Sequence, residues 1–224
     1  MKPLIALVAA LAWSSADGRQ TSAPGAAAVL VLGAPAAPAQ AATSRAVVVV
    51  FETEKGSIEI EVDPQRAPLT AANFLKYVDG RFYDGGAVNR AVRPDNTVRH
   101  DVEIQVIQFQ VDATRRREQF PPIPLERTSL TGLRHADGAV SMARNEPDTA
   151  TASFSIVIGD QPEMDFGGKR NPDGQGFAVF GRVVKGMDVV KAIQASATGQ
   201  RGAYRTETLD PPIRILKAYR RQGS

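Results

Sequence analysis

The stretch Gly176–Val190 reads GFAVFGRVVKGMDVV and predicts a strand that leads directly into a helix. Phe177–Val184 is rich in β-branched and aromatic residues, which favour strands. Gly186 marks the turn after the strand, and apolar residues then follow at helical spacing: Val189, Val190 and Ile193. We therefore expect a strand followed by a helix that buries one face.

Short strands of the same kind recur along the chain. The other predicted strands are Ala46–Phe51, Ser57–Val62, Phe82–Val92, Val102–Gln108, Ala139–Ala143, Phe154–Ile158 and Pro212–Tyr219. One further helix is expected, beginning at Pro68 and closing at Gly80, with a single apolar stripe. Seven or eight short strands with two helices predict a mostly-β fold, an antiparallel barrel or sandwich whose open ends the helices cover.

Composition excludes several classes of function. The 224 residues carry 27 Lys and Arg against 24 Asp and Glu, with no basic block interleaved with aromatics, so we expect no nucleic-acid partner. The lack of cysteine excludes disulfides, cysteine catalysis and thiolate metal sites. His100 and His135 are predicted to be surface residues, and neither has further metal ligands at regular spacing. Serine-nucleophile and phosphate-loop motifs are absent, so we expect no metal, cofactor or covalent intermediate.

Residues 1–42 differ from the rest of the chain. Lys2 precedes an apolar run, and a second Ala-rich stretch ends in Ala39-Gln40-Ala41, a small-x-small pattern suited to a signal peptidase. We interpret 1–42 as a signal peptide, the alternative being a disordered Ala/Pro-rich tail, and 43–224 as the mature domain in the periplasm. No apolar run of about 18 residues follows, so we expect no stable membrane insertion.

Several segments in order resemble the cyclophilin family of peptidyl-prolyl isomerases, in particular its exported bacterial branch. They include A-P-L-T-A-A-N-F-L-K-Y-V-D-G, G-L-R-H-A-D-G-A-V-S-M-A-R, T-A-x-x-F-S-I-V-I-G-D-Q and G-F-A-V-F-G-R-V-V-K-G-M-D-V-V, and together they span essentially all of residues 46–195. The resemblance implies an eight-stranded antiparallel β-barrel capped by two α-helices, in agreement with the strand and helix pattern.

The resemblance also implies a set of site residues. Arg90 stands at the position of the catalytic arginine, and an insertion at roughly 94–103 separates it from the glutamine that Gln108 matches. The implied substrate-binding residues are Gln108, Val106, Gln105, Ala143, Arg144, Ser153, Ser155, Met164 and Phe177. Gln105 and Ser155 stand where the family has phenylalanines of the proline pocket, and Ser153 replaces a glutamine. The active site is therefore expected to be divergent.

The family implies a cofactor-free isomerase that acts on X–Pro bonds of folding exported proteins. The altered pocket leaves a second reading open, in which the domain binds or chaperones extended peptides with little or no isomerase activity. An unrelated β-barrel carrier is a remote third reading. Under the first two readings the partners are proline-containing polypeptide segments, and we expect a monomer.

Overall fold

The computed structural model describes residues 47–199 and 205–222. The predicted signal peptide at 1–42 lies outside the described residues, so this prediction and that of export stay untested. No helix in the described ranges is both long and apolar enough to cross a bilayer.

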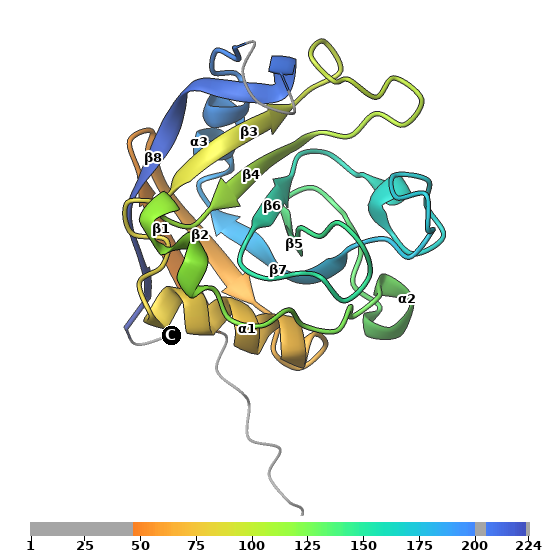
Figure 1. The fold of residues 1–224 in the computed structure, drawn as a ribbon, viewed down its shortest axis with the longest axis horizontal. Helices are drawn as coiled ribbons and strands as arrows, with labels where there is room; N and C mark the ends of the chain where they lie inside the picture. The colour runs from red at the N-terminus through yellow and green to blue at the C-terminus, as the bar shows by residue number, and fades with distance from the viewer. Residues whose placement is uncertain (1–46, 200–204, 223–224) are drawn as a thin grey trace, which may run out of the picture. The chain divides into compact units, whose positions relative to one another are not determined.

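Eight antiparallel strands close into a barrel in the order β1-β2-β7-β5-β6-β4-β3-β8 (Figure 1). Their bounds are β1 Val47–Thr53, β2 Gly56–Val62, β3 Ala87–Val92, β4 Val106–Gln110, β5 Ala139–Met142, β6 Phe154–Val157, β7 Ala178–Lys185 and β8 Thr208–Arg220. Closure leaves no unpaired sheet edge in the barrel. The mostly-β fold is confirmed, as a barrel rather than a sandwich.

Two helices cover opposite ends of the barrel, α1 (Pro68–Asp79) and α3 (Met187–Gln194) (Figure 1). Gly186 precedes α3 with φ of 92°, and a Cβ there would lie 2.4 Å from the Ser57 carbonyl oxygen, so only glycine fits this turn. The strand-to-helix prediction is thus confirmed with its glycine. One-turn α2 (Thr128–Thr131) and three 3₁₀ turns, η1 (Ala113–Glu118), η2 (Pro162–Met164) and η3 (Arg205–Glu207), complete the elements.

An aromatic cluster fills the barrel. Phe51, Phe74, Phe109, Phe154 and Phe180 are fully buried, and the rings of Phe109 and Phe154 stack with centroids 4.6 Å apart. Burial of each ring contributes roughly 1.5–3 kcal/mol relative to exposure. Phe154 therefore belongs to the core, as its strand position predicts, and is not available to a surface pocket.

Two predicted strands begin later than expected. β3 starts at Ala87 because the chain turns through residues 81–85, where Phe82 and Tyr83 are buried by packing rather than by strand alternation. β4 starts at Val106, since Val102 and Ile104 are buried in the preceding loop. Val102 and Ile104 imitate the period-two pattern of a strand, which misplaced the start of β4, whereas adjacent buried aromatic residues misplaced the start of β3.

Candidate active site

Two neighbouring cavities lie on the barrel wall and share three residues, Arg90, Gln108 and Arg144. The first, here the polar cavity, has a volume of about 270 Å³ and lies between β3, β4 and the loop from Ala143 to Ser153. The second, here the arginine cavity, has a volume of about 190 Å³ and includes Arg99 and Arg170. Together they form a groove with Arg90 at the junction.

The structure brings nearly all the predicted site residues into this groove. Ala143 and Ser153 line the polar cavity, and the arginine cavity is lined by Val106, Ser155, Met164 and Phe177. Gln105 lines neither cavity. Its side-chain oxygen faces Gln194 of α3, with the amide nitrogen 3.5 Å away. Gln105 therefore lies on the α3 side of the barrel wall and is not placed to contact a substrate in the groove.

Arg90 is held by a buried carboxylate that the sequence did not indicate. Its Nε and Nη2 donate to Oε2 of Glu207 at 2.8 and 2.6 Å, and its Nη1 donates to Oε1 of Gln108 at 3.4 Å. The Arg90 side chain is 13% exposed and that of Glu207 is not exposed at all. Because Glu207 engages one edge of the guanidinium, the Nη1 edge is turned toward Gln108 and the groove.

The second carboxylate oxygen of Glu207 forms hydrogen bonds with the inserted loop at 94–103. Oε1 accepts from the Thr97 hydroxyl at 3.1 Å and from the Val98 backbone N–H at 3.0 Å. A single carboxylate therefore links β3 to the loop that follows it. Glu207 is separated from Arg90 by 117 positions, so no local pattern could reveal the pair. The sequence shows only an acidic residue in the stretch before the predicted strand Pro212–Tyr219, and in the structure that strand begins earlier, at Thr208, directly after Glu207.

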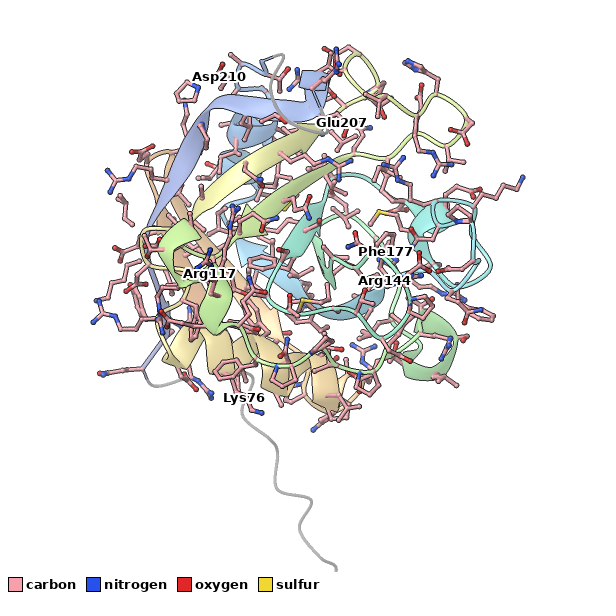
Figure 2. The ribbon with its side chains drawn as sticks, viewed as in Figure 1. Lys76, Arg117, Arg144, Phe177, Glu207 and Asp210 are labelled. Atoms are coloured by element: carbon pink, nitrogen blue, oxygen red, sulfur yellow. The ribbon has the colours of Figure 1, made fainter. Side chains whose placement is uncertain are left out.

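The apolar part of the groove is small. Met164 is 3% exposed and Phe177 is half-buried, while Ser155 faces the same cavity where the family resemblance leads one to expect a phenylalanine. Arg144 lies over the Phe177 ring, with its Cζ 5.4 Å from the centroid, and forms a two-pronged ion pair with Asp173. Figure 2 shows Arg144 and Phe177 together, with Glu207 above them in the view.

The predicted insertion contributes cations rather than an aromatic wall. Arg99, from the insertion, and Arg170, from the loop between β6 and β7, both line the arginine cavity. Neither was predicted, because each is a charged loop residue with no periodicity to place it. Phe166 is 45% exposed and lines neither cavity, so it adds no aromatic wall to the groove.

His135 is not a surface residue, and that prediction is wrong. It is 2% exposed, its Nδ1 lies 2.7 Å from Oδ1 of Asp165, and its Nε2 lies 2.8 Å from the Ser141 hydroxyl. Burial alone would raise the pKa of Asp165, but hydrogen bonds from the His135 ring and backbone N–H, with the charge of Arg134, bring it below its ordinary value. Ser141 is 1% exposed, so this serine–histidine–aspartate arrangement cannot meet a substrate.

The buried network of Ser141, His135 and Asp165 lies next to residues that line the groove. Asp165 directly follows Met164, and Ser141 pairs across the sheet with Ser155. Both neighbours line the arginine cavity. Among the residues described, no group of three or more histidine, aspartate or glutamate side chains is arranged to hold a metal ion.

Comparison with known proteins assigns the family. Residues 48–220 match the family described as cyclophilin type peptidyl-prolyl cis-trans isomerase/CLD. The chain is 36% identical over 177 residues to peptidyl-prolyl cis-trans isomerase A of Dickeya dadantii, covering 79% of this chain and 85% of the relative. It is 32% identical to peptidyl-prolyl cis-trans isomerase B of Escherichia coli K12, covering 70% and 89%.

A solved structure shares the fold. A cyclophilin type peptidyl-prolyl cis-trans isomerase of Cryptosporidium parvum superposes with a TM-score of 0.62 at 15% identity, covering 80% of this chain and all of that one. The fold is thus that of a cyclophilin barrel. The chain belongs to the cyclophilin-type peptidyl-prolyl cis-trans isomerases, a family of enzymes, which confirms the resemblance. Its assignment to an exported branch stays a prediction.

Proposed function

We propose that the protein isomerises X–Pro bonds of polypeptides bound in the groove, with Arg90 as the catalytic residue. The observation that supports this role is the placement of Arg90: its guanidinium lies where the two cavities meet and is oriented by Glu207 and Gln108. A peptide crossing the groove would place its backbone in one cavity and its proline ring against Met164 and Phe177 in the other.

The chemistry requires only binding and electrostatics. Rotation about the X–Pro bond crosses roughly 18–20 kcal/mol because resonance stiffens the C–N bond. A catalyst accelerates the rotation by binding the twisted, less conjugated state more tightly than either planar state. A guanidinium is permanently charged and rigid, and it can donate to the prolyl nitrogen as that atom becomes pyramidal and regains its lone pair. Loss of one such preorganised donor costs about 3–4 kcal/mol in other enzymes.

Glu207 acts as a positioning residue in this scheme. Its oxygen accepts from Nε and Nη2 together, which fixes the plane of the guanidinium, and a fixed donor loses little entropy when the substrate binds. Its other oxygen fixes the loop that forms one wall of the arginine cavity. Arg90 and the wall are therefore oriented by one buried group.

Exchange NMR on an Ala-Pro tetrapeptide tests the proposal. Wild-type protein should broaden the paired cis and trans resonances, and the Arg90→Ala variant should leave them sharp while circular dichroism shows that it is folded. Arg81→Ala, which removes an exposed arginine paired with Asp84 outside the groove, is the matched control and should behave as wild type.

A second function is favoured by one observation, the lack of an aromatic wall beside Ser155. A groove that holds the proline ring only against Met164 and Phe177 could bind extended peptides without accelerating their isomerisation. Peptide binding by both wild type and Arg90→Ala, with no exchange broadening by either, would assign the domain to this class.

We also propose that the protein is a monomer exported to the periplasm, where it acts on folding exported proteins. The support is the apolar leader with Ala39-Gln40-Ala41 at its end, and a cysteine-free chain suits an oxidising compartment. Trp13 is the only tryptophan in the chain, so protein purified from the native envelope should lack tryptophan in its intact mass and absorbance. Retention of Trp13 there would refute export with cleavage.

A further inference from the structure

The arginine cavity is lined by positively charged side chains and by no carboxylate of the described residues. Four guanidinium groups line it, those of Arg90, Arg99, Arg144 and Arg170, and no acidic side chain from the described ranges does. Three of the four have a carboxylate partner outside the lining: Glu207 for Arg90, Asp101 for Arg99 and Asp173 for Arg144. Arg170 makes no ion pair within the described part of the chain.

Arg170 is more than nine-tenths buried, with 9% of its surface exposed. Its one side-chain hydrogen bond to a described residue runs from Nη1 to the Val102 carbonyl oxygen at 3.0 Å. Arg170 lines the cavity, and none of its nitrogens is among the fully buried, unpartnered atoms of the described residues, so its donors without a hydrogen bond keep some solvent access. A desolvated guanidinium with no carboxylate in ion-pair contact is costly, and an anion supplied from outside would reduce that cost.

The charges around Arg170 also favour the binding of an anion. Burial lowers the pKa of Arg170, and the like charges of Arg90 and Arg99 lower it further, while Glu207 and Asp101 offset only part of the effect. A bound anion would stabilise all three guanidinium groups at once. The cavity is therefore electrostatically suited to a negatively charged ligand.

Two hydrogen bonds fix the cations in place. Nη1 of Arg99 donates to the carbonyl oxygen of Arg170 at 2.7 Å, and Arg170 donates in return to Val102. These bonds join the insertion after β3 to the loop between β6 and β7. They hold the two arginines in the same cavity as Met164 and Phe177, the residues proposed to contact the proline ring.

We propose that the arginine cavity binds a carboxylate carried by the peptide beside its proline, with Arg170 as the principal counter-charge and Arg99 as the second. The carboxylate can come from an acidic side chain directly before or after the proline, or from a C-terminal proline itself. This inference rests on the proposed isomerase groove and deepens it, because it names the class of substrate that the groove prefers.

Three matched peptide pairs test the preference and its source. They are Ala-Glu-Pro-Ala against Ala-Gln-Pro-Ala, Ala-Pro-Glu-Ala against Ala-Pro-Gln-Ala, both capped at their ends, and N-acetyl-Ala-Ala-Pro as the free acid against its amide. NMR titration gives the Kd, and exchange spectroscopy gives the isomerisation rate. At least one acidic member should bind about tenfold tighter than its neutral partner, an advantage that salt weakens. The pair that shows the advantage identifies the source.

Three variants of the full chain assign the preference to Arg170. Arg170→Gln should bring the ratio of the two Kd values to about one, whereas Arg170→Lys, which keeps the charge, should retain most of it. Arg182→Gln removes the same charge from an exposed ion pair with Glu61 and should leave the ratio unchanged. If Arg170→Gln does not fold, the ratios of Kd values measured with wild type still show whether the groove prefers acidic peptides.

Equal affinity of wild type for both members of every pair would overturn the proposal, as would an equal loss of the ratio in Arg182→Gln. These results differ from a failure of the isomerase function. If acidic peptides bind preferentially but none is isomerised, the carboxylate site stands and the isomerase proposal falls. If all peptides are isomerised and bound alike, the isomerase stands and the carboxylate site falls.

Discussion

Replacing Glu207 with glutamine tests whether a buried carboxylate positions Arg90. Glutamine has nearly the same shape but no charge, and only one of its two terminal atoms accepts hydrogen bonds. If its oxygen faces Arg90, its amide group faces the backbone N–H of Val98, which then lacks the acceptor it has now. An unsatisfied donor costs about 1–3 kcal/mol, and breaking a buried ion pair costs about 3–5 kcal/mol. We expect the free energy of unfolding to fall by about 3 kcal/mol because glutamine keeps part of the bonding.

The same variant should also lose activity. A guanidinium that is no longer fixed through Nε and Nη2 reaches the productive orientation less often, so kcat should fall about tenfold. KM should change less than kcat, because Glu207 lines neither cavity and reaches the arginine cavity only through the loop at Thr97 and Val98. Urea unfolding and exchange NMR, both at a temperature where circular dichroism shows folded protein, measure the two effects. Glu61→Gln, in an exposed ion pair 3.0 Å from Arg182, is the control and should cost less than about 1 kcal/mol with unchanged kcat. Wild-type stability or a wild-type kcat in Glu207→Gln would show that Glu207 does not position Arg90.

Three other predictions concern the pocket and its support. Ser155→Phe should return an aromatic wall beside Met164 and raise kcat/KM several-fold, by about 1 kcal/mol, whereas an equally stable variant that is no faster would show that the groove is not placed for isomerisation. Cyclosporin-type macrocycles should bind more weakly than micromolar by calorimetry. The family resemblance implies that Glu163 replaces the tryptophan of cyclosporin-sensitive members, and its carboxylate accepts the Lys169 backbone N–H; submicromolar binding would contradict this. Because the pKa of Asp165 is lowered in the folded protein, its stabilisation is complete above the ordinary value of 3.8 and is lost as pH falls through the lower folded value. The stability difference between wild type and Asp165→Asn in urea should therefore shrink below about pH 4, and a difference independent of pH would refute it.

The barrel was predictable because its determinants are local. Neighbouring residues are enough to predict the strand alternation, the helix that begins at Pro68 and the turn at Gly186. That the strands close into a barrel followed from the order of the family motifs. The two late strand starts were not predictable. Val102 and Ile104 alternate as a strand would, and only the folded chain shows that they pack from a loop.

The groove was predictable only as far as the motifs reach. Arg90, Gln108 and Phe177 could be placed because each lies in a strand or next to one with a recognisable sequence. Glu207 and Arg170 could not, because they reach the site from a 3₁₀ turn and a loop far along the chain from Arg90. His135 was misread for the same reason: its partner Asp165 is 30 positions away, and a histidine beside charged neighbours looks exposed when the partner is unknown.

Exchange NMR on an Ala-Pro tetrapeptide, with wild type and Arg90→Ala compared at equal concentration, measures directly whether Arg90 catalyses the isomerisation. We expect rapid cis–trans exchange with wild type and a loss of roughly 100-fold or more in the variant, because a donor worth about 3–4 kcal/mol is removed. Equal exchange rates with both proteins, each shown to be folded, would contradict this expectation and remove Arg90 from the catalytic role.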